Sequence, residues 1–154
     1  MTVTIGTPAP DFTLASDTGE PVTLSALSGR TVVLYFYPRD DTPGCTRQAC
    51  GLRDAWTEVA ATGTVVFGVS PDSVERHARF RAKYALPFAL LADTERTVAT
   101  AYGVWAEKMS YGRRLMGIER SSFVIGPDGV VAHVFRRVKP DRHAEQILAA
   151  LREE

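Results

Sequence analysis

A near-continuous apolar run at residues 31–37 dominates the hydrophobic pattern of the chain. The run is rich in β-branched and aromatic side chains, and Pro38 stops it. Such a run is typical of a strand buried on both faces, as in the middle of an α/β sheet. A polar loop follows the strand, and beyond it apolar residues recur at helical spacing and predict a helix that ends at Gly63. The inward residues of this helix are Ala49, Leu52, Trp56, Val59 and Ala60.

The start of this helix has a recognisable cap. Thr42 fits the N-cap position and Pro43 the first helical position, where a missing N–H is harmless. Cys45 is then the third residue of the helix, close to unpaired backbone N–H groups and to the positive end of the helix dipole. Both features favour a thiolate over a thiol, so Cys45 is the expected reactive sulfur.

Shorter patterns predict the remaining elements. Residues 12–14 and 22–24 predict a small hairpin that turns at Gly19. Residues 104–117 fit neither the helical nor the strand period and are predicted to form an ordered loop. The other predictions are strands at 65–69 and 88–91, a helix at 72–84 with Asp72 and Glu75 spaced as a capping box, a helix at 94–102, a hairpin of 121–125 and 130–135, and a terminal helix from about 141.

The order of these elements predicts an α/β protein. A βαβ unit is followed by an αβα segment and a ββα ending, and right-handed crossovers place helices on both faces of a central sheet. This is the plan of a thioredoxin-like fold, with a central mixed sheet and an N-terminal hairpin, in a single domain over residues 1–154. Ligands bind at the carboxyl ends of strands in open α/β sheets, and Cys45 is expected there.

Composition narrows the functional classes. The 154 residues are 45% hydrophobic, and 18 Lys and Arg balance 18 Asp and Glu, so neither nucleic acid nor an anionic membrane is an expected partner. The first residues show no signal-peptide pattern, and we expect a cytoplasmic protein. Two cysteines in a reducing compartment are either incidental or active in redox chemistry. No metal or other cofactor is expected, because the histidines are scattered at His77, His133 and His143, away from zinc-like spacing.

Residues 38–45, which read Pro-Arg-Asp-Asp-Thr-Pro-Gly-Cys, match the Pro-x-x-x-Thr-x-x-Cys motif of the peroxiredoxins. Cys50 matches the second cysteine of their Q, or bacterioferritin-comigratory, subgroup. Residues 117–123 resemble the segment that supplies the active-site arginine of the family, here Arg120, and residues 102–105 with Glu107 and Lys108 are also similar to the subgroup. The resemblance spans nearly the whole chain.

The resemblance implies an antioxidant peroxidase in which the Cys45 thiolate attacks a hydroperoxide and becomes a sulfenic acid. Cys50 would resolve this acid as an intramolecular disulfide, and thioredoxin or a similar dithiol would reduce it, so that a monomer suffices for turnover. Arg120 and Thr42 would contact the peroxide oxygens, and Pro38 would limit water over the thiolate. Asp40 and Asp41 oppose ionisation of Cys45, whereas Arg39, Arg47 and Arg120 favour it.

The spacing of the two cysteines adds a geometric condition. Cα atoms five residues apart on a regular helix are separated by about 8.7 Å. A disulfide requires less than about 7 Å, so bridging Cys45 to Cys50 needs local unwinding of the helix.

Other interpretations remain open from the residues alone. Cys50 could fill the core beside Ala49, Thr42 could be a simple N-cap, and Arg120 could be a surface charge. A Cu(I) carrier would use both cysteines and a histidine, since soft thiolates suit that ion. A dithiol oxidoreductase acting on protein disulfides would instead need Cys-x-x-Cys at the helix start, which this chain lacks.

Overall fold

A computed structural model describes residues 3–153, apart from the side chains of Lys108 and Ser110, so the predicted domain limits of 1–154 extend beyond it at both ends. The elements in chain order are β1 (Thr13–Ser16), β2 (Pro21–Thr23), the 3-10 helix η1 (Leu24–Leu27), β3 (Val32–Phe36), α1 (Pro43–Asp54), α2 (Trp56–Ala61), β4 (Val65–Ser70), α3 (Val74–Tyr84), β5 (Ala89–Ala92), α4 (Thr97–Ala101), β6 (Trp105–Ser110), β7 (Arg113–Ile118), β8 (Ser121–Ile125), β9 (Val131–Phe135), the 3-10 helix η2 (Pro140–Arg142) and α5 (His143–Arg152).

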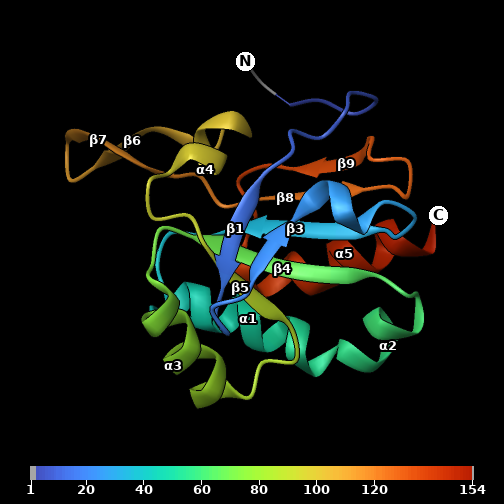
Figure 1. The fold of residues 1–154 in the computed structure, drawn as a ribbon. Coiled ribbons are helices and arrows are strands. Elements are labelled where there is room, and N and C mark those ends of the chain that lie inside the picture. Colours follow the sequence, from blue (N-terminus) through green and yellow to red (C-terminus); the bar gives the residue numbers. More distant parts are fainter. Residues whose placement is uncertain (1–2, 154) are drawn as a thin grey trace.

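Seven strands form one mixed sheet in the order β2-β1-β5-β4-β3-β8-β9 (Figure 1). Strands β3, β4 and β5 run parallel to one another, whereas β1 pairs antiparallel with β5 and β8 pairs antiparallel with β3. The predicted central strand is therefore confirmed as β3, and the predicted N-terminal hairpin as β1 and β2, with Gly19 at a φ of +88° in the connecting turn. The predicted hairpin near the C-terminus is confirmed as β8 and β9.

Helices cover both faces of the sheet, as predicted, but unequally. Alternate residues of β3 enter two apolar cores, with Leu34 in one and Val33 and Tyr35 in the other. Among the described helices, α1, α2, α3 and α5 lie on the Val33 side and α4 on the opposite side (Figure 1). None of the helices within residues 3–153 is long and apolar enough to cross a membrane.

The helix predicted up to Gly63 is interrupted. Ala55, with φ −95° and ψ 9°, separates α1 from α2, and its N–H donates to the carbonyl oxygens of both Arg53 and Gly51. After this bend α2 buries Val59 completely but leaves Ala60 exposed, so the prediction that Ala60 faces inward is wrong. The bend was not predictable from the apolar spacing, because that spacing continues without a break from α1 into α2.

Two predicted helix starts lie elsewhere. Ser73, not Asp72, caps α3, and its hydroxyl oxygen accepts a hydrogen bond from the N–H of Arg76 at 3.2 Å, so the capping box with Asp72 is wrong. Helix α4 begins at Thr97 rather than at Thr94, because the carboxylate of Asp93 accepts the N–H groups of the residues at 98 and 99.

Residues 104–117 are not a loop. Most of them belong to an antiparallel hairpin of β6 and β7, which extends away from the main sheet (Figure 1). Its turn is Tyr111-Gly112, and both residues have positive φ, 51° and 77°. Large apolar side chains on this hairpin are exposed, so it lacks the one-sided burial that produces a readable alternation. These side chains are Met109, Tyr111, Leu115 and Met116.

Candidate active site

The loop that enters the site leaves the carboxyl end of β3. The N–H of Tyr37 donates to the carbonyl of Val69 at 3.1 Å and continues the contact with β4. Pro38 follows and is half-buried, Arg39 is exposed, and Asp40 is buried again. Cys45 thus lies at the sheet edge where ligands bind in open α/β folds, as the sequence predicted.

Thr42 occupies the N-cap of α1 and Pro43 its first position, as predicted. Thr42 does not cap through its side chain, however, because its hydroxyl donates to the carbonyl oxygen of Arg39 at 3.0 Å. Thr42 is therefore the N-cap by position, without the side-chain hydrogen bond of a usual cap. Because the hydroxyl hydrogen is occupied, the lone pairs of the Thr42 oxygen remain for a further donor.

Cys45 is the third residue of α1 and is only 2% exposed. Its sulfur packs among the apolar residues of the core on the Val33 side, including Tyr37 and Ala49. The same sulfur accepts a hydrogen bond from Nη1 of Arg120 at 3.4 Å. Cys45 thus combines a position in the first turn of α1 with a charged hydrogen-bond donor at its sulfur.

Gln48 also accepts a hydrogen bond from the guanidinium of Arg120. Nη1 of Arg120 donates to Oε1 of Gln48 at 2.6 Å, and Gln48 is completely buried. Gln48 follows Cys45 by three positions, so both side chains project from one face of α1. The sequence reasoning missed Gln48, although a polar residue at that spacing on the inward face was an available signal.

Gly44 leaves room for the guanidinium. A Cβ atom at this position would lie 3.2 Å from Nη2 of Arg120 and 3.5 Å from Cγ of Pro140. Few real Cβ atoms approach other atoms so closely, so any larger residue would press on the guanidinium. The close approach of Arg120 thus favours a glycine directly before Cys45.

The other charges near the helix start are paired with one another. Arg47 contacts Asp141 at 3.0 Å, and the carboxylate of Asp41 accepts from Lys83 at 2.7 Å and from Tyr84 at 2.8 Å. The hydrogen bond from Lys83 is the main cause of the lowered pKa of Asp41. Of the charged groups named from the sequence, Arg120 is the one that contacts the Cys45 sulfur among the described residues.

A neutral histidine lies on the same side of the sheet. His143, the first residue of α5, is completely buried, and its Nε2 is 2.6 Å from the hydroxyl of Ser122. Burial, helped by the positive charge of Arg120, lowers the pKa of His143 to about 3. His143 is thus uncharged at neutral pH and brings no second cation close to Arg120.

Both cysteines are free thiols on one continuous helix, with Cys45 buried and Cys50 partly exposed. The unwinding expected on disulfide formation therefore stays a prediction.

One cluster of possible metal ligands occurs in the described part of the chain. The ligand atoms of Asp40, Asp72 and His77 lie within 4.8 Å of one another. This cluster is a feature that the sequence reasoning missed, because it treated each histidine as isolated.

Comparison with known proteins agrees with this geometry. The sequence pattern of the AhpC/TSA family matches residues 5–134. Peroxiredoxin Bcp of Bacillus subtilis is 46% identical over 153 residues, which cover 99% of this chain and 98% of that protein. Peroxiredoxin Bcp of Escherichia coli is 44% identical over 145 residues, with 94% and 93% covered.

A solved structure of the bacterioferritin comigratory protein of Xanthomonas campestris, described for its alkyl peroxide reduction activity, superposes with a TM-score of 0.88. It is 39% identical, and the match covers 92% of this chain and 90% of that chain. The thioredoxin-like fold expected from the order of elements is therefore confirmed. The similarity of the chain to Bcp peroxiredoxins supports a thiol-dependent peroxidase, and the chain belongs to the AhpC/TSA family.

Proposed function

We propose that this chain reduces hydrogen peroxide and alkyl hydroperoxides with Cys45 as the attacking thiolate. The observation that carries this assignment is the guanidinium of Arg120, 3.4 Å from the Cys45 sulfur. The activity described for the Xanthomonas relative supports alkyl hydroperoxides as a substrate class.

In the first step the Cys45 thiolate attacks the nearer oxygen of the hydroperoxide. An S–O bond forms while the O–O bond breaks, so the sulfur is oxidised to a sulfenic acid. The leaving oxygen takes both electrons of the broken bond, acquires a proton and departs as water or an alcohol. Negative charge moves from sulfur to this leaving oxygen, and the site has to stabilise it there.

Arg120 and Thr42 have complementary roles in this step. The guanidinium of Arg120 has further N–H groups, which donate to the oxygens as charge develops on them. The Thr42 oxygen, with its hydrogen directed to Arg39, accepts the O–H of the hydroperoxide. Pro38, which lacks an N–H, shields the sulfur from water.

Magnitudes show why these contacts matter more than thiolate formation. Lowering the pKa of a cysteine from about 8.5 to about 6 raises the thiolate fraction at neutral pH by roughly thirtyfold. Enzymes typically accelerate their reactions by a factor of about 10⁶ or more over the uncatalysed rate. The larger part of the acceleration therefore comes from donors directed at the two oxygens.

Cys50 resolves the sulfenic acid in the second step. Its thiolate attacks the sulfur of Cys45, an S–S bond forms, and the hydroxyl group leaves as water. The first turns of α1 unwind to bring the two sulfurs together. An external dithiol, with thioredoxin as the expected partner, then reduces the disulfide by exchange, in a reducing compartment such as the cytoplasm. Both cysteines belong to one chain, so one monomer of a single domain completes the cycle without another cofactor.

The test is peroxide consumption with thioredoxin and its reductase for wild type, Cys45→Ser and Cys50→Ser. We expect no turnover from Cys45→Ser. Cys50→Ser should react once, form a sulfenic acid that a dimedone probe traps, and then stall. Full turnover by Cys45→Ser would overturn the proposal, and full turnover by Cys50→Ser without an added thiol would overturn the resolving role.

Two other activities are disfavoured by the contacts at the sulfur. A guanidinium 3.4 Å from Cys45 repels a bound copper ion, so a Cu(I) titration should give no stoichiometric complex. A protein disulfide reductase should reduce insulin, and we expect no such activity because Cys45 has no partner cysteine within the first turn of α1.

A further inference from the structure

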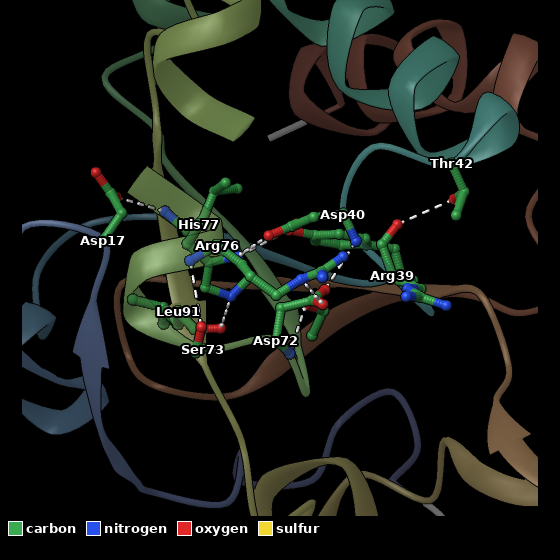
Figure 2. Close-up of polar contacts among 12 residues, drawn as sticks. Asp17, Arg39, Asp40, Thr42, Asp72, Ser73, Arg76, His77 and Leu91 are labelled. Atoms are coloured by element: carbon green, nitrogen blue, oxygen red, sulfur yellow. Dashed lines mark hydrogen bonds and ion pairs between the residues drawn. The ribbon is translucent and has the colours of Figure 1, made fainter. Parts of the chain in front are cut away.

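A hydrogen-bonded group connects the catalytic loop at Asp40 to α3. We call it the loop clamp, and it consists of Tyr37, Asp40, Asp72 and His77. Figure 2 shows Asp40 and Asp72 close together, with His77 on their left and Arg39 and Thr42 on their right. Asp40 is 3% exposed and His77 is completely buried, so water does not replace these contacts.

Both side-chain oxygens of Asp40 are engaged. The hydroxyl of Tyr37 donates to Oδ1 at 2.5 Å, and Nδ1 of His77 lies 2.7 Å from Oδ2. The other ring nitrogen of His77 is 2.9 Å from the carbonyl oxygen of Leu91 on β5. A carbonyl oxygen only accepts, so Nε2 of His77 carries a hydrogen, and one further proton is shared between Nδ1 and Asp40. The pair is therefore neutral as a unit, which suits its complete burial.

The backbone of Asp40 is held as well. Its N–H donates to Oδ2 of Asp72 at 2.7 Å. Asp72 is itself fixed by the hydroxyl of Ser70 at 2.7 Å and by Nε of Arg76 at 3.0 Å. The carboxylate and imidazole atoms of the clamp are thus already used by protein donors and acceptors, and Arg76 supplies the positive charge. These contacts make the cluster a hydrogen-bond network rather than a metal site.

The clamp connects to the catalytic threonine through one peptide group. The N–H that donates to Asp72 and the carbonyl that accepts from Thr42 belong to the same peptide unit, between Arg39 and Asp40. A peptide unit is planar and rigid, so fixing its N–H also fixes the direction of its carbonyl. That carbonyl determines where the Thr42 hydroxyl hydrogen points, and hence where its lone pairs are directed.

We propose that His77 is a positioning residue for Thr42, acting through Asp40 and the peptide group between residues 39 and 40. This inference rests on the peroxidase function proposed above and assigns a role to α3, which contributes no group that contacts the sulfur among the described contacts. Without His77 the Asp40 side chain loses one of its two partners, the peptide group tilts, and the Thr42 oxygen no longer meets the O–H of the hydroperoxide. Reactions of Cys45 that do not use Thr42 are unaffected.

The experiment compares two reactions of the same sulfur. Pre-reduced wild type, His77→Leu and His77→Asn are mixed with hydrogen peroxide in a stopped-flow fluorimeter, and separately with iodoacetamide, whose attack requires only an accessible thiolate. Misplacement of a group by about 1 Å can reduce a rate by about 100-fold, so we expect His77→Leu to lose about 10- to 100-fold with peroxide. The alkylation rate should change by less than about twofold, because the thiolate and Arg120 are retained.

His77→Asn provides the rescue. Its amide nitrogen replaces Nδ1 as the partner of Asp40 but does not reach Leu91, so we expect recovery of at least about fivefold over His77→Leu. Arg152→Ala is the matched control, since it removes an exposed ion pair with Glu58 at the far end of α5. Equal losses in both reactions for His77→Leu would make the residue merely structural, and no loss with peroxide would also overturn the proposal.

A second pair of variants covers the case in which His77→Leu does not fold. Asp40→Asn keeps an oxygen for Tyr37 and supplies an N–H for Nδ1 of His77, whereas Asp40→Ala removes both contacts. We expect Asp40→Ala to lose more peroxide reactivity than Asp40→Asn at equal alkylation rates, and equal losses would contradict the clamp.

If wild type itself reacts with peroxide no faster than free cysteine does, the peroxidase function fails. The clamp is then judged by the amide chemical shift of Thr42, which should move in Asp40→Ala and less in Asp40→Asn.

Discussion

The guanidinium of Arg120 contacts the sulfur of Cys45 at 3.4 Å, although 75 positions separate the two residues. Gln48 accepts from the same nitrogen at 2.6 Å, so the arginine is oriented by the helix that carries the cysteine. A cation held in a buried site needs little rearrangement when charge develops on a substrate, and this favours fast reaction.

Replacing Arg120 by lysine tests whether its shape or its charge matters. Lysine keeps the charge but lacks the planar guanidinium, in which Nη1 contacts both Gln48 and Cys45 and further N–H groups remain for the peroxide. The loss of one such donor typically lowers a rate by about 10²- to 10³-fold. We expect a loss of this size in the single-turnover reaction of Arg120→Lys with peroxide, measured by stopped-flow fluorescence. The exposed Arg47→Lys, whose partner is Asp141, should stay within about twofold. A wild-type rate in Arg120→Lys would show that charge alone suffices.

Gly44→Ala should separate stability from activity. The new Cβ would meet Nη2 of Arg120 at 3.2 Å and displace the guanidinium, so we expect about tenfold slower oxidation by peroxide. Gly51→Ala on the same helix is the matched control, because its Cβ would make only an ordinary contact, 3.9 Å from Ala144. The control should gain up to about 1 kcal/mol of stability from helix propensity with no loss in rate. Equal peroxide rates for the two variants would contradict the role given to Gly44.

His143 should make stability depend on pH. Its pKa is lowered from 6.5 to about 3 in the folded protein, so the unfolded chain binds the proton first as the pH falls. The contribution of the neutral histidine to the free energy of unfolding is therefore complete above pH 6.5. It decreases by about 1.4 kcal/mol per pH unit as the pH falls towards 3. Urea unfolding between pH 7 and pH 4 should show a steeper decline for wild type than for His143→Gln. Parallel curves would mean that His143 is not held neutral by the fold.

Amide hydrogen exchange should reveal the rearrangement of α1. Exchange over residues 42–52 should be slow in the reduced protein and much faster after one equivalent of peroxide, because the bridge between Cys45 and Cys50 cannot form on a regular helix. Strand β3 should stay protected in both forms, and Cys50→Ser should abolish the difference. Equal protection of residues 42–52 in both redox states would exclude local unwinding.

Local patterns were sufficient to predict the central strand, the start of α1 and the place of Cys45. These features depend on a long apolar run and on Pro43, so residues that are close in sequence determine them. The approach of Arg120 to Cys45 was expected only from the family resemblance, because no periodicity connects residues so distant in the chain.

Contacts that form only in the folded chain were not predictable from the pattern. Gln48, His77 and His143 look like ordinary helical residues, and each acquires its role from a partner on another element. The direction of the Thr42 hydroxyl was missed for a similar reason, since a free carbonyl on Arg39 competes with the usual cap. The β6–β7 hairpin escaped detection because its two faces are similarly exposed.

Ala55 divides the crossover between β3 and β4 into two short helices with different anchors. Helix α2 is anchored by Val59, which is completely buried, and it meets α1 at Ala55, whose N–H donates to Gly51 and whose carbonyl accepts from Val59. Loss of helical order near the sulfur can therefore stop before α2 and leave the sheet intact. The oxidised chain would keep its folded body and refold the same short segment after each reduction.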